Sequence, residues 1–460
     1  MDNSKQLVAK YGLFTAISMV VGQVIGSGIF FKVDDVLLAT EGSAIAGLLG
    51  FFIVGISVIF ASITMANYSQ LIPKDGGILS YVEYRFGEKA AALVGWIYLS
   101  LFYPILTAVL FTVSGIYISH FIAEFYPLTP NFIHYSSIGL IGSFLFFLFN
   151  IYRPKSSGLF QQLTTVLKLI PLVLIASFGV LTLLPESQDT TTSITFSSIS
   201  QQSSKGSFWT LVAASFIPIA FAFDGWYIAT QISGEVKNAR KNLPRALIVG
   251  TSLVLVVYVL YYLGIVLRMS PESILQYKDT YIIEYSKKFG SSAASWIMQL
   301  FIIVSVLGTA NGLMLASIRV PFQFYNLKAT KKFLHLGKLH PKTGMPIRSA
   351  YFAYAWISLY IVAYFLTNTL RVFTEIHYDL SAIPIGFIYM VNGALFMGLF
   401  KLLREGVISN KRTLKSIFAI IALLGIAIVL IGTASSQNGL SYLLVSAAYI
   451  FVGFLFIRRN

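Results

Sequence analysis

The sequence predicts an all-α polytopic membrane protein with twelve transmembrane helices. Of its 460 residues, 56% are hydrophobic and only 11% are charged, whereas a soluble domain carries about 25% charged residues. The mean hydropathy is +0.77. So few charges cannot cover a water-facing surface, which excludes a soluble enzyme, a disordered chain and a coiled-coil or collagen rod.

Each predicted helix corresponds to an apolar run between charged or polar breaks. Runs of about 20 apolar residues are what a hydrocarbon layer ~30 Å thick requires of an α-helix. A backbone exposed to lipid must satisfy its own hydrogen bonds, so each run has to be helical. The twelve runs cover residues 12–39, 43–66, 90–119, 133–151, 158–184, 208–232, 243–267, 292–324, 348–366, 373–400, 414–434 and 442–457.

The distribution of basic residues predicts the orientation of these helices. With the N-terminus placed in the cytoplasm, 25 of the 33 Lys and Arg residues fall in inner segments, seven fall in outer segments, and Lys168 lies inside a span. Cytoplasmic loops of membrane proteins are enriched in Lys and Arg. The net charge of +15 is therefore explained by topology rather than by nucleic-acid binding, and both termini are expected in the cytoplasm.

The first run is too long for one straight crossing. Its 28 residues at 1.5 Å each would reach ~42 Å, beyond the hydrocarbon thickness. Gly22, Gly26 and Gly28 lie near its middle, and each glycine lowers helix propensity by about 1 kcal/mol relative to alanine. We expect this stretch either to unwind and expose its N–H groups or to form a small-residue face for close helix packing.

The sixth run carries a second disruption. Pro218 is followed by Phe221, Asp224 and Trp226 near the middle of the span. A carboxylate at membrane depth costs ~2.5–3.5 kcal/mol, so Asp224 needs a role there. It either caps a broken half-helix or lines a polar cavity, and the two roles are compatible.

The two disruptions lie five helices apart. A repeat with an odd number of helices inserts its second copy upside down, which is typical of inverted-repeat secondary transporters. In such folds half-helix N-termini face a substrate anion, while exposed carbonyls bind cations near the bilayer midplane. An α-amino acid carries one group of each kind, so it matches the predicted site.

A lysine also lies inside the fifth run. Lys168 is about ten residues past the inner boundary of that run, so its side chain reaches the interface only under strain. The alternative is a fixed ammonium that faces the bundle interior and bonds carbonyls or a hydroxyl.

Several segments resemble amino-acid permeases of the amino acid–polyamine–organocation superfamily, and within it the bacterial L-type transporters. The matching segments follow the family's order from the first span to the ninth. They are residues 26–30, 72–77, 162–171, 221–226, 234–246, 311–312 with 319–320, and 340–346.

The resemblance implies a domain organisation. The whole chain, 1–460, would form one transport domain of the leucine-transporter type. Residues 12–184 would be a first repeat of five helices, residues 208–400 the inverted second repeat, and residues 401–460 two additional helices. Helices 1 and 6 would be the broken ones.

The resemblance also implies a substrate site at the two breaks. Backbone amides would hold the carboxylate, backbone carbonyls would hold the ammonium, and an aromatic ring would close over the substrate from outside. The amides are those of Gly26, Ser27 and Gly28; the carbonyls are those of Val24, Phe221 and Asp224; the gating ring is Phe221; and Ile25, Ile29, Ala222, Phe223 and Gly225 complete the site.

Lys168 resembles the family's span 5 lysine, which would tie helix 1 near Gly22 to Ser305 of helix 8. In sodium-coupled relatives of the fold a metal ion occupies about that place. A fixed cation there implies sodium-independent transport, with no metal and no cofactor.

Three positions depart from the family pattern. Phe223 replaces a usual Tyr, Ala239 replaces a usual Pro of an inner loop, and Leu79 replaces a Tyr after a Gly pair. The first substitution removes a hydroxyl close to the predicted site and bears on side-chain preference. The other two concern loop geometry.

The function expected from these features is sodium-independent transport of neutral, small or hydroxylated L-amino acids by alternating access, as an exchanger. Proton-coupled symport is the alternative, since Lys168 and Asp224 could titrate. An intramembrane enzyme with Ser27 as nucleophile and Lys168 as base is a remote one, because no nucleophile-elbow or metal-binding motif accompanies them. A channel is equally remote, because the sequence contains no recognisable filter segment.

The partners and location follow from the resemblance and the composition. Animal members bind a glycoprotein through an outer-loop Cys, and this chain has no cysteine. We therefore expect no disulfide-linked heavy-chain partner, an L-amino acid substrate, contact with membrane lipid, and a place in a bacterial cytoplasmic membrane.

Overall fold

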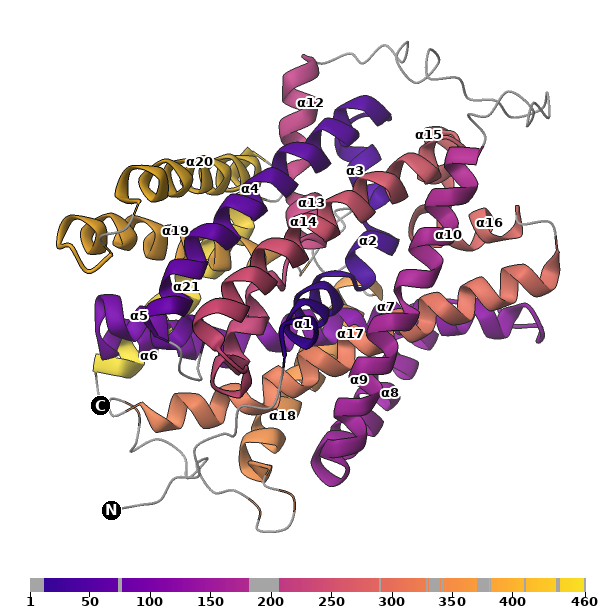
Figure 1. Ribbon diagram of the computed structural model, residues 1–460. Coiled ribbons are helices and arrows are strands. Elements are labelled where there is room, and N and C mark those ends of the chain that lie inside the picture. The colour runs from indigo at the N-terminus through magenta and orange to yellow at the C-terminus, as the bar shows by residue number, and fades with distance from the viewer. Residues whose placement is uncertain are drawn as a thin grey trace.

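The computed structural model describes the chain in a series of segments and is helical almost throughout them (Figure 1). This confirms the predicted all-α class. The described residues are 12–72, 77–181, 207–288, 291–327, 330, 340, 343, 345–369, 380, 382–408, 411–435 and 439–458.

The first half of the chain contains eleven described helical segments, one of which is a π-helical turn, η1. They are α1 (Leu13–Val24), α2 (Ser27–Phe31), α3 (Val33–Ala39), α4 (Ala44–Leu71), α5 (Ile78–Phe86), α6 (Glu88–Ile97), η1 (Tyr98–Phe102), α7 (Tyr103–Ala123), α8 (Phe132–Tyr152), α9 (Pro154–Leu167) and α10 (Leu169–Val180).

The second half begins with a helix in two pieces and a 3₁₀ segment, and ends with long helices. The described segments are α12 (Phe208–Ala214), α13 (Phe216–Ala222), η4 (Trp226–Glu235), α14 (Ala239–Val266), α15 (Pro271–Tyr277), η5 (Lys278–Thr280), α16 (Tyr281–Lys287), α17 (Ser292–Asn326), α18 (Ile347–Thr369), α19 (Ala382–Arg404), α20 (Arg412–Ser435) and α21 (Gly439–Arg458).

Ten helices within the described residues are long and apolar enough to cross a membrane. Two shorter apolar helices, Leu13–Val24 and Leu444–Leu455, coincide with parts of the first and twelfth predicted runs. The polytopic class is therefore confirmed, and the count of twelve crossings stays a prediction. Residues 373–379 at the start of the tenth predicted run lie outside the described part of the chain.

Polar side chains mark the starts of several long helices. Ser43 accepts a hydrogen bond from the backbone N–H of Ala46 at the start of α4. Asn131 accepts two such bonds at the start of α8, and Ser291 accepts one at the start of α17. These caps satisfy N–H groups that have no partner within the helix, which explains why the helices begin where they do.

The helices pack around a small central group (Figure 1). α14 packs against α4, α1 and α10, while α17 packs against α7, α18 and α9. α1, α2 and α13 lie near the middle of the bundle. Helices that the expected repeat makes equivalent, α4 with α14 and α7 with α17, are in direct contact. The repeat boundaries themselves stay a prediction.

Candidate functional site

The first helix is interrupted at Ile25 and Gly26. α1 ends at Val24, Ile25 is extended, and α2 begins at Ser27 with no side-chain cap at Gly26. Gly26 faces Thr309 of α17, and a Cβ atom added at Gly26 would lie 2.5 Å from the Thr309 Oγ1 atom. Only glycine therefore fits this approach, and the first amides of α2 have no partner within their helix.

The second interruption covers residues 223–225. α13 ends at Ala222, and the chain resumes as the 3₁₀ segment η4. Gly225 has φ +95°, a conformation that side-chain-bearing residues rarely adopt. The Asp224 Oδ1 atom accepts a hydrogen bond from the Tyr227 hydroxyl at 3.0 Å, so this carboxylate has a partner one turn along its own segment.

One tyrosine joins the two interruptions. The hydroxyl oxygen of Tyr258 on α14 lies 2.7 Å from the Val24 carbonyl oxygen and 3.0 Å from the Ala222 carbonyl oxygen. Both are carbonyls at the end of a helix, where intrahelical partners run out. A single buried hydroxyl thus serves the ends of α1 and α13 together.

Lys168 lies at the junction of α9 and α10. Pro171 has no N–H and cannot serve the Leu167 carbonyl, so a change of helix is expected here. The Lys168 side chain is fully buried, and its Nζ atom donates to the Gly22 carbonyl at 2.5 Å and to the Thr309 hydroxyl at 3.0 Å. The ammonium therefore faces the bundle interior and not the interface.

The hydroxyl partner of Lys168 differs from the expected one. We expected Ser305, but Thr309 lies one helical turn further along α17 and makes the bond instead. Within the described residues, the Ser305 Oγ atom has no hydrogen-bond partner. Ser305 and Thr309 are four residues apart and share one face of α17. The depth at which α9 crosses α17 therefore determines which of the two hydroxyls meets Lys168.

A cavity of about 40 Å³ lies between the two interruptions, with room for a few water molecules. Seven of the predicted site residues line it, together with six others that the sequence did not indicate. The predicted ones are Val24, Gly26, Gly28, Phe221, Ala222, Asp224 and Gly225; the others are Gln23, Leu106, Leu110, Ile228, Thr309 and Leu313.

Other predicted site residues do not line this cavity. The ring of Phe223 lies 5.0 Å from that of Tyr258 and 6.5 Å from that of Phe51, in the core behind the break. Ile25 and Ile29 are fully buried without reaching the cavity. The reason is geometric, since successive residues of a helical segment point about 100° apart. The Ser27 side chain lies outside the described part.

Four of the six residues that sequence reasoning missed come from the neighbouring helices, while Gln23 and Ile228 lie on α1 and η4 beside the interruptions. Leu106 and Leu110 are on α7, and Thr309 and Leu313 are on α17. In the sequence they are ordinary residues of apolar helices, so their position was not apparent. Only the segment at 311–312, beside Thr309, pointed to this part of α17.

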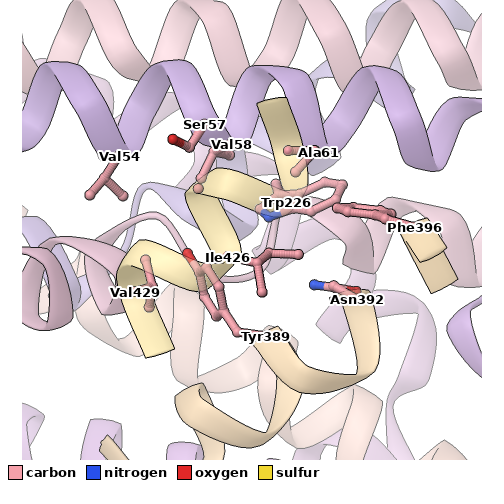
Figure 2. Close-up of a pocket in the computed structure, with 12 residues that line it drawn as sticks. Val54, Ser57, Val58, Ala61, Trp226, Tyr389, Asn392, Phe396, Ile426 and Val429 are labelled. Atoms are coloured by element: carbon pink, nitrogen blue, oxygen red, sulfur yellow. The ribbon is translucent and has the colours of Figure 1, made fainter. Parts of the chain in front are cut away.

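A second, smaller cavity lies behind Trp226, between α4, α19 and α20 (Figure 2). Its volume is about 20 Å³, enough for one water molecule. Ser57, Tyr389 and Asn392 are among its polar lining residues, and the Asn392 Oδ1 atom has no partner in the described structure. None of the predicted site residues belongs to it.

The described residues offer no candidate metal centre, since no three His, Asp or Glu side chains among them gather closely enough to hold an ion. The charged groups at the breaks are instead single ones, Lys168 and Asp224, each with a hydrogen-bond partner from the protein.

Solved structures share this fold. The crystal structure of MhsT in complex with L-phenylalanine matches with a TM-score of 0.59 at 12% identity, covering 93% of this chain and all of that one. A manganese transporter from Eremococcus coleocola matches with a TM-score of 0.61 at 12% identity, over 100% of this chain and 99% of that one. At such identity these likenesses concern the fold alone.

Relatives with clearer sequence similarity are transporters. The chain is 28% identical over 406 residues to the serine/threonine exchanger SteT of Bacillus subtilis (strain 168), covering 88% of this chain and 86% of the relative. It is 29% identical over 320 residues to the human large neutral amino acids transporter small subunit 2. That match covers 69% of this chain and 57% of the human protein.

A family model described as amino acid permease matches residues 11–457, almost the whole chain. This match confirms the resemblance drawn from the sequence segments, and the relatives confirm a transporter rather than an enzyme. The chain therefore belongs to the amino acid permease family.

Proposed function

We propose that the protein is a sodium-independent exchanger of neutral, small or hydroxylated L-amino acids that works by alternating access. The observation that carries this proposal is the cavity between the two helix interruptions, lined by both of them. Similarity to a serine/threonine exchanger and to large neutral amino acid transporters supports neutral amino acids as substrates and exchange as the mode.

The backbone groups at the breaks suit a zwitterion. The free amides at the start of α2 would receive the carboxylate, since helix N-termini favour anions. The ammonium would lie near the Val24 carbonyl and the half-buried Asp224. Tyr258 already contacts the Val24 carbonyl, so it would orient this acceptor rather than leave it fully available.

The side walls of the cavity are largely apolar. Leu106, Leu110, Ile228 and Leu313 supply apolar surface, and Thr309 adds a hydroxyl-bearing side chain from α17. A volume of about 40 Å³ holds only a few water molecules, so the walls must move to admit any amino acid. Alanine, serine and threonine are the expected substrates because a serine/threonine exchanger is among the relatives.

Lys168 supports sodium independence. Its ammonium joins the Gly22 carbonyl on α1 to the Thr309 hydroxyl on α17. A fixed charge at this junction performs a task for which a bound cation would otherwise be needed, because it attracts the carbonyl at the end of a helix. Transport should then proceed equally well in sodium and potassium.

The distribution of basic residues supports an orientation with both termini in the cytoplasm and a place in the bacterial cytoplasmic membrane. Lys32 and α15 and α16 would then lie on the outer side. The chain has no cysteine, so no disulfide to a partner subunit can form.

The test uses purified protein in liposomes. Uptake of labelled L-serine, L-threonine or L-alanine is expected to be much faster when unlabelled amino acid is inside, and unchanged when potassium replaces sodium. Equal uptake into loaded and empty vesicles would disprove exchange, and loss of uptake in potassium would disprove sodium independence.

A proton-coupled symporter is the second candidate, favoured by the half-buried Asp224 carboxyl group at the cavity wall. It predicts uptake into empty vesicles driven by an inward pH gradient, and loss of that uptake in Asp224→Asn. If exchange is the same in Asp224→Asn and in the parent protein, only the backbone groups of Asp224 contribute to transport.

A further inference from the structure

A buried lysine lies beside an aromatic ring that lines the cavity. Lys32 connects α2 to α3 and is only 3% exposed. Its Nζ atom lies 2.7 Å from the Asp35 Oδ2 atom and 5.1 Å from the centroid of the Phe221 ring. The ammonium is therefore held between a carboxylate and the face of an aromatic ring.

Asp35 and Phe221, which both contact Lys32, face different surroundings. The Asp35 side chain is 41% exposed, while Phe221 lines the cavity. An ammonium that has lost its water needs opposite charge or the negative face of a ring in exchange. Displacing the Phe221 ring would leave the ammonium without the ring face that replaces its lost water. The charge on Lys32 therefore stabilises the present position of the ring.

Phe221 is also confined from the side of α2. A Cβ atom added at Gly28 would lie 3.4 Å from the Phe221 Cδ1 atom and 2.9 Å from the Ala222 Cα atom. The ring thus lies directly against the start of α2 and borders both Lys32 and the cavity. Movement of the ring out of this position would separate it from the lysine.

We infer that Lys32 is a positioning residue that holds the Phe221 ring across the mouth of the cavity, so that its charge sets how readily this side opens. The inference rests on the proposed function only in treating this cavity as the transport path. It predicts that loss of the charge favours opening on the side of Lys32 and leaves the other side unchanged.

The chain supplies a matched control. Lys287 forms an ion pair with Glu284 at the same three-residue spacing and the same 2.7 Å distance, but its side chain is 48% exposed and it lies on α16, far from Phe221 in the sequence. Removing this charge also removes an ion pair of the same length and spacing. Lys287→Met is therefore the control for Lys32→Met.

The experiment uses the absence of native cysteine. Leu110→Cys places one thiol on the α7 wall of the cavity, and a membrane-impermeant thiol reagent is added to intact cells. We expect labelling about tenfold faster with Lys32→Met, as loss of a desolvated cation–π contact suggests, and unchanged with Lys287→Met. Lys32→Arg should restore the parent rate, because guanidinium also binds a carboxylate and stacks on rings.

A double-mutant cycle tests whether the lysine acts through the ring. Phe221→Leu should speed labelling by itself, and adding Lys32→Met to it should have little further effect. Equal labelling rates with and without the Lys32 charge, including no labelling in either case, would overturn the inference. Additive effects of Lys32→Met and Phe221→Leu on the labelling rate would also overturn it. Because labelling needs no transport, a failed liposome assay with these labelling results would contradict the proposed function alone.

Discussion

The two helix interruptions satisfy their polar groups in different ways. At the first, the carbonyls of Gly22 and Val24 are contacted by side chains from other helices, Lys168 and Tyr258. At the second, Asp224 is contacted by Tyr227 of its own segment, and Gly225 turns the chain with a positive φ. Tyr258 also lies beside the Ala222 carbonyl at the second break, so this break shares one neighbour with the first but adds a contact within its own segment. The first break thus depends on its neighbours, whereas the second carries part of its own support.

This difference suggests distinct roles for the two breaks. A helix end whose carbonyls are contacted from the α9–α10 junction and from α14 is coupled to the position of those helices, so it can transmit their movement. A break that is partly satisfied within its own segment depends less on the position of its neighbours. Substitutions at the borrowed contacts should therefore have larger effects on transport than substitutions within the second break.

The largest effect is expected from Lys168→Ala. It removes two hydrogen bonds from an ammonium, each worth about 1.5–3 kcal/mol, and leaves the Gly22 carbonyl and the Thr309 hydroxyl without that partner. We expect exchange in liposomes to fall at least about hundredfold while the protein remains folded. If the variant elutes normally on size exclusion and exchanges nearly as fast as the parent, the hydrogen bonds of Lys168 are dispensable for transport. Loss of expression would indicate that the lysine has a purely structural role.

The next effect is expected from Gly26→Ala. Its Cβ atom would come within 2.5 Å of the Thr309 Oγ1 atom and 2.7 Å of its Cγ2 atom, so α2 or α17 must shift. We expect apparent affinity for substrate to weaken roughly tenfold or more, since overpacking typically costs about 1–3 kcal/mol. Measured in a Thr309→Ala background, the same substitution should cost less, because the two closest atoms are gone and only the Thr309 Cβ contact at 2.9 Å remains. An equal cost in both backgrounds would show that the two residues do not meet.

Tyr258→Phe should have a moderate effect. It deletes the hydroxyl that lies beside the carbonyls of Val24 and Ala222, and a neutral hydrogen bond contributes about 0.5–1.5 kcal/mol. Apparent affinity should weaken about three- to tenfold. Tyr262→Phe is the matched control, because it deletes an equally buried hydroxyl on the same helix that bonds the Ala44 carbonyl away from the breaks. Equal losses in the two variants would contradict a special role for Tyr258.

Much of this fold could be predicted from the sequence, because the governing signals are local. Long uncharged runs require helices in lipid, and a helix start or break is marked within a few residues by glycine, proline or a capping side chain. In the structure, helices end at Val24, within residues 22–28, and at Ala222, close to Asp224. Lys168 was expected to face inward because a charge at that depth has few other stable positions.

The missing part of the site depends on contacts between helices. Thr309, Tyr258 and Leu110 reach the breaks through the rotation and depth of α17, α14 and α7, which no local pattern encodes. Phe223 is the opposite case, because its position next to Asp224 in the sequence predicted a site residue, whereas its ring packs in the core against Tyr258. A family resemblance indicates which residue type to expect at a position. It did not distinguish Ser305 from Thr309, one helical turn apart, as the partner of Lys168.

The smallest effect is expected at Ser305, where sequence and structure disagree. If Thr309 is the partner of Lys168, Ser305→Ala should change exchange by less than about twofold, because its hydroxyl has no partner among the described residues to lose. Thr309→Val keeps the shape but removes the hydroxyl that Lys168 bonds, and a hydrogen bond to a charged group is worth about 1.5–3 kcal/mol, so exchange should fall about tenfold or more. The reverse order of effects would restore Ser305 as the partner and would place α17 one turn away from its observed register against α9.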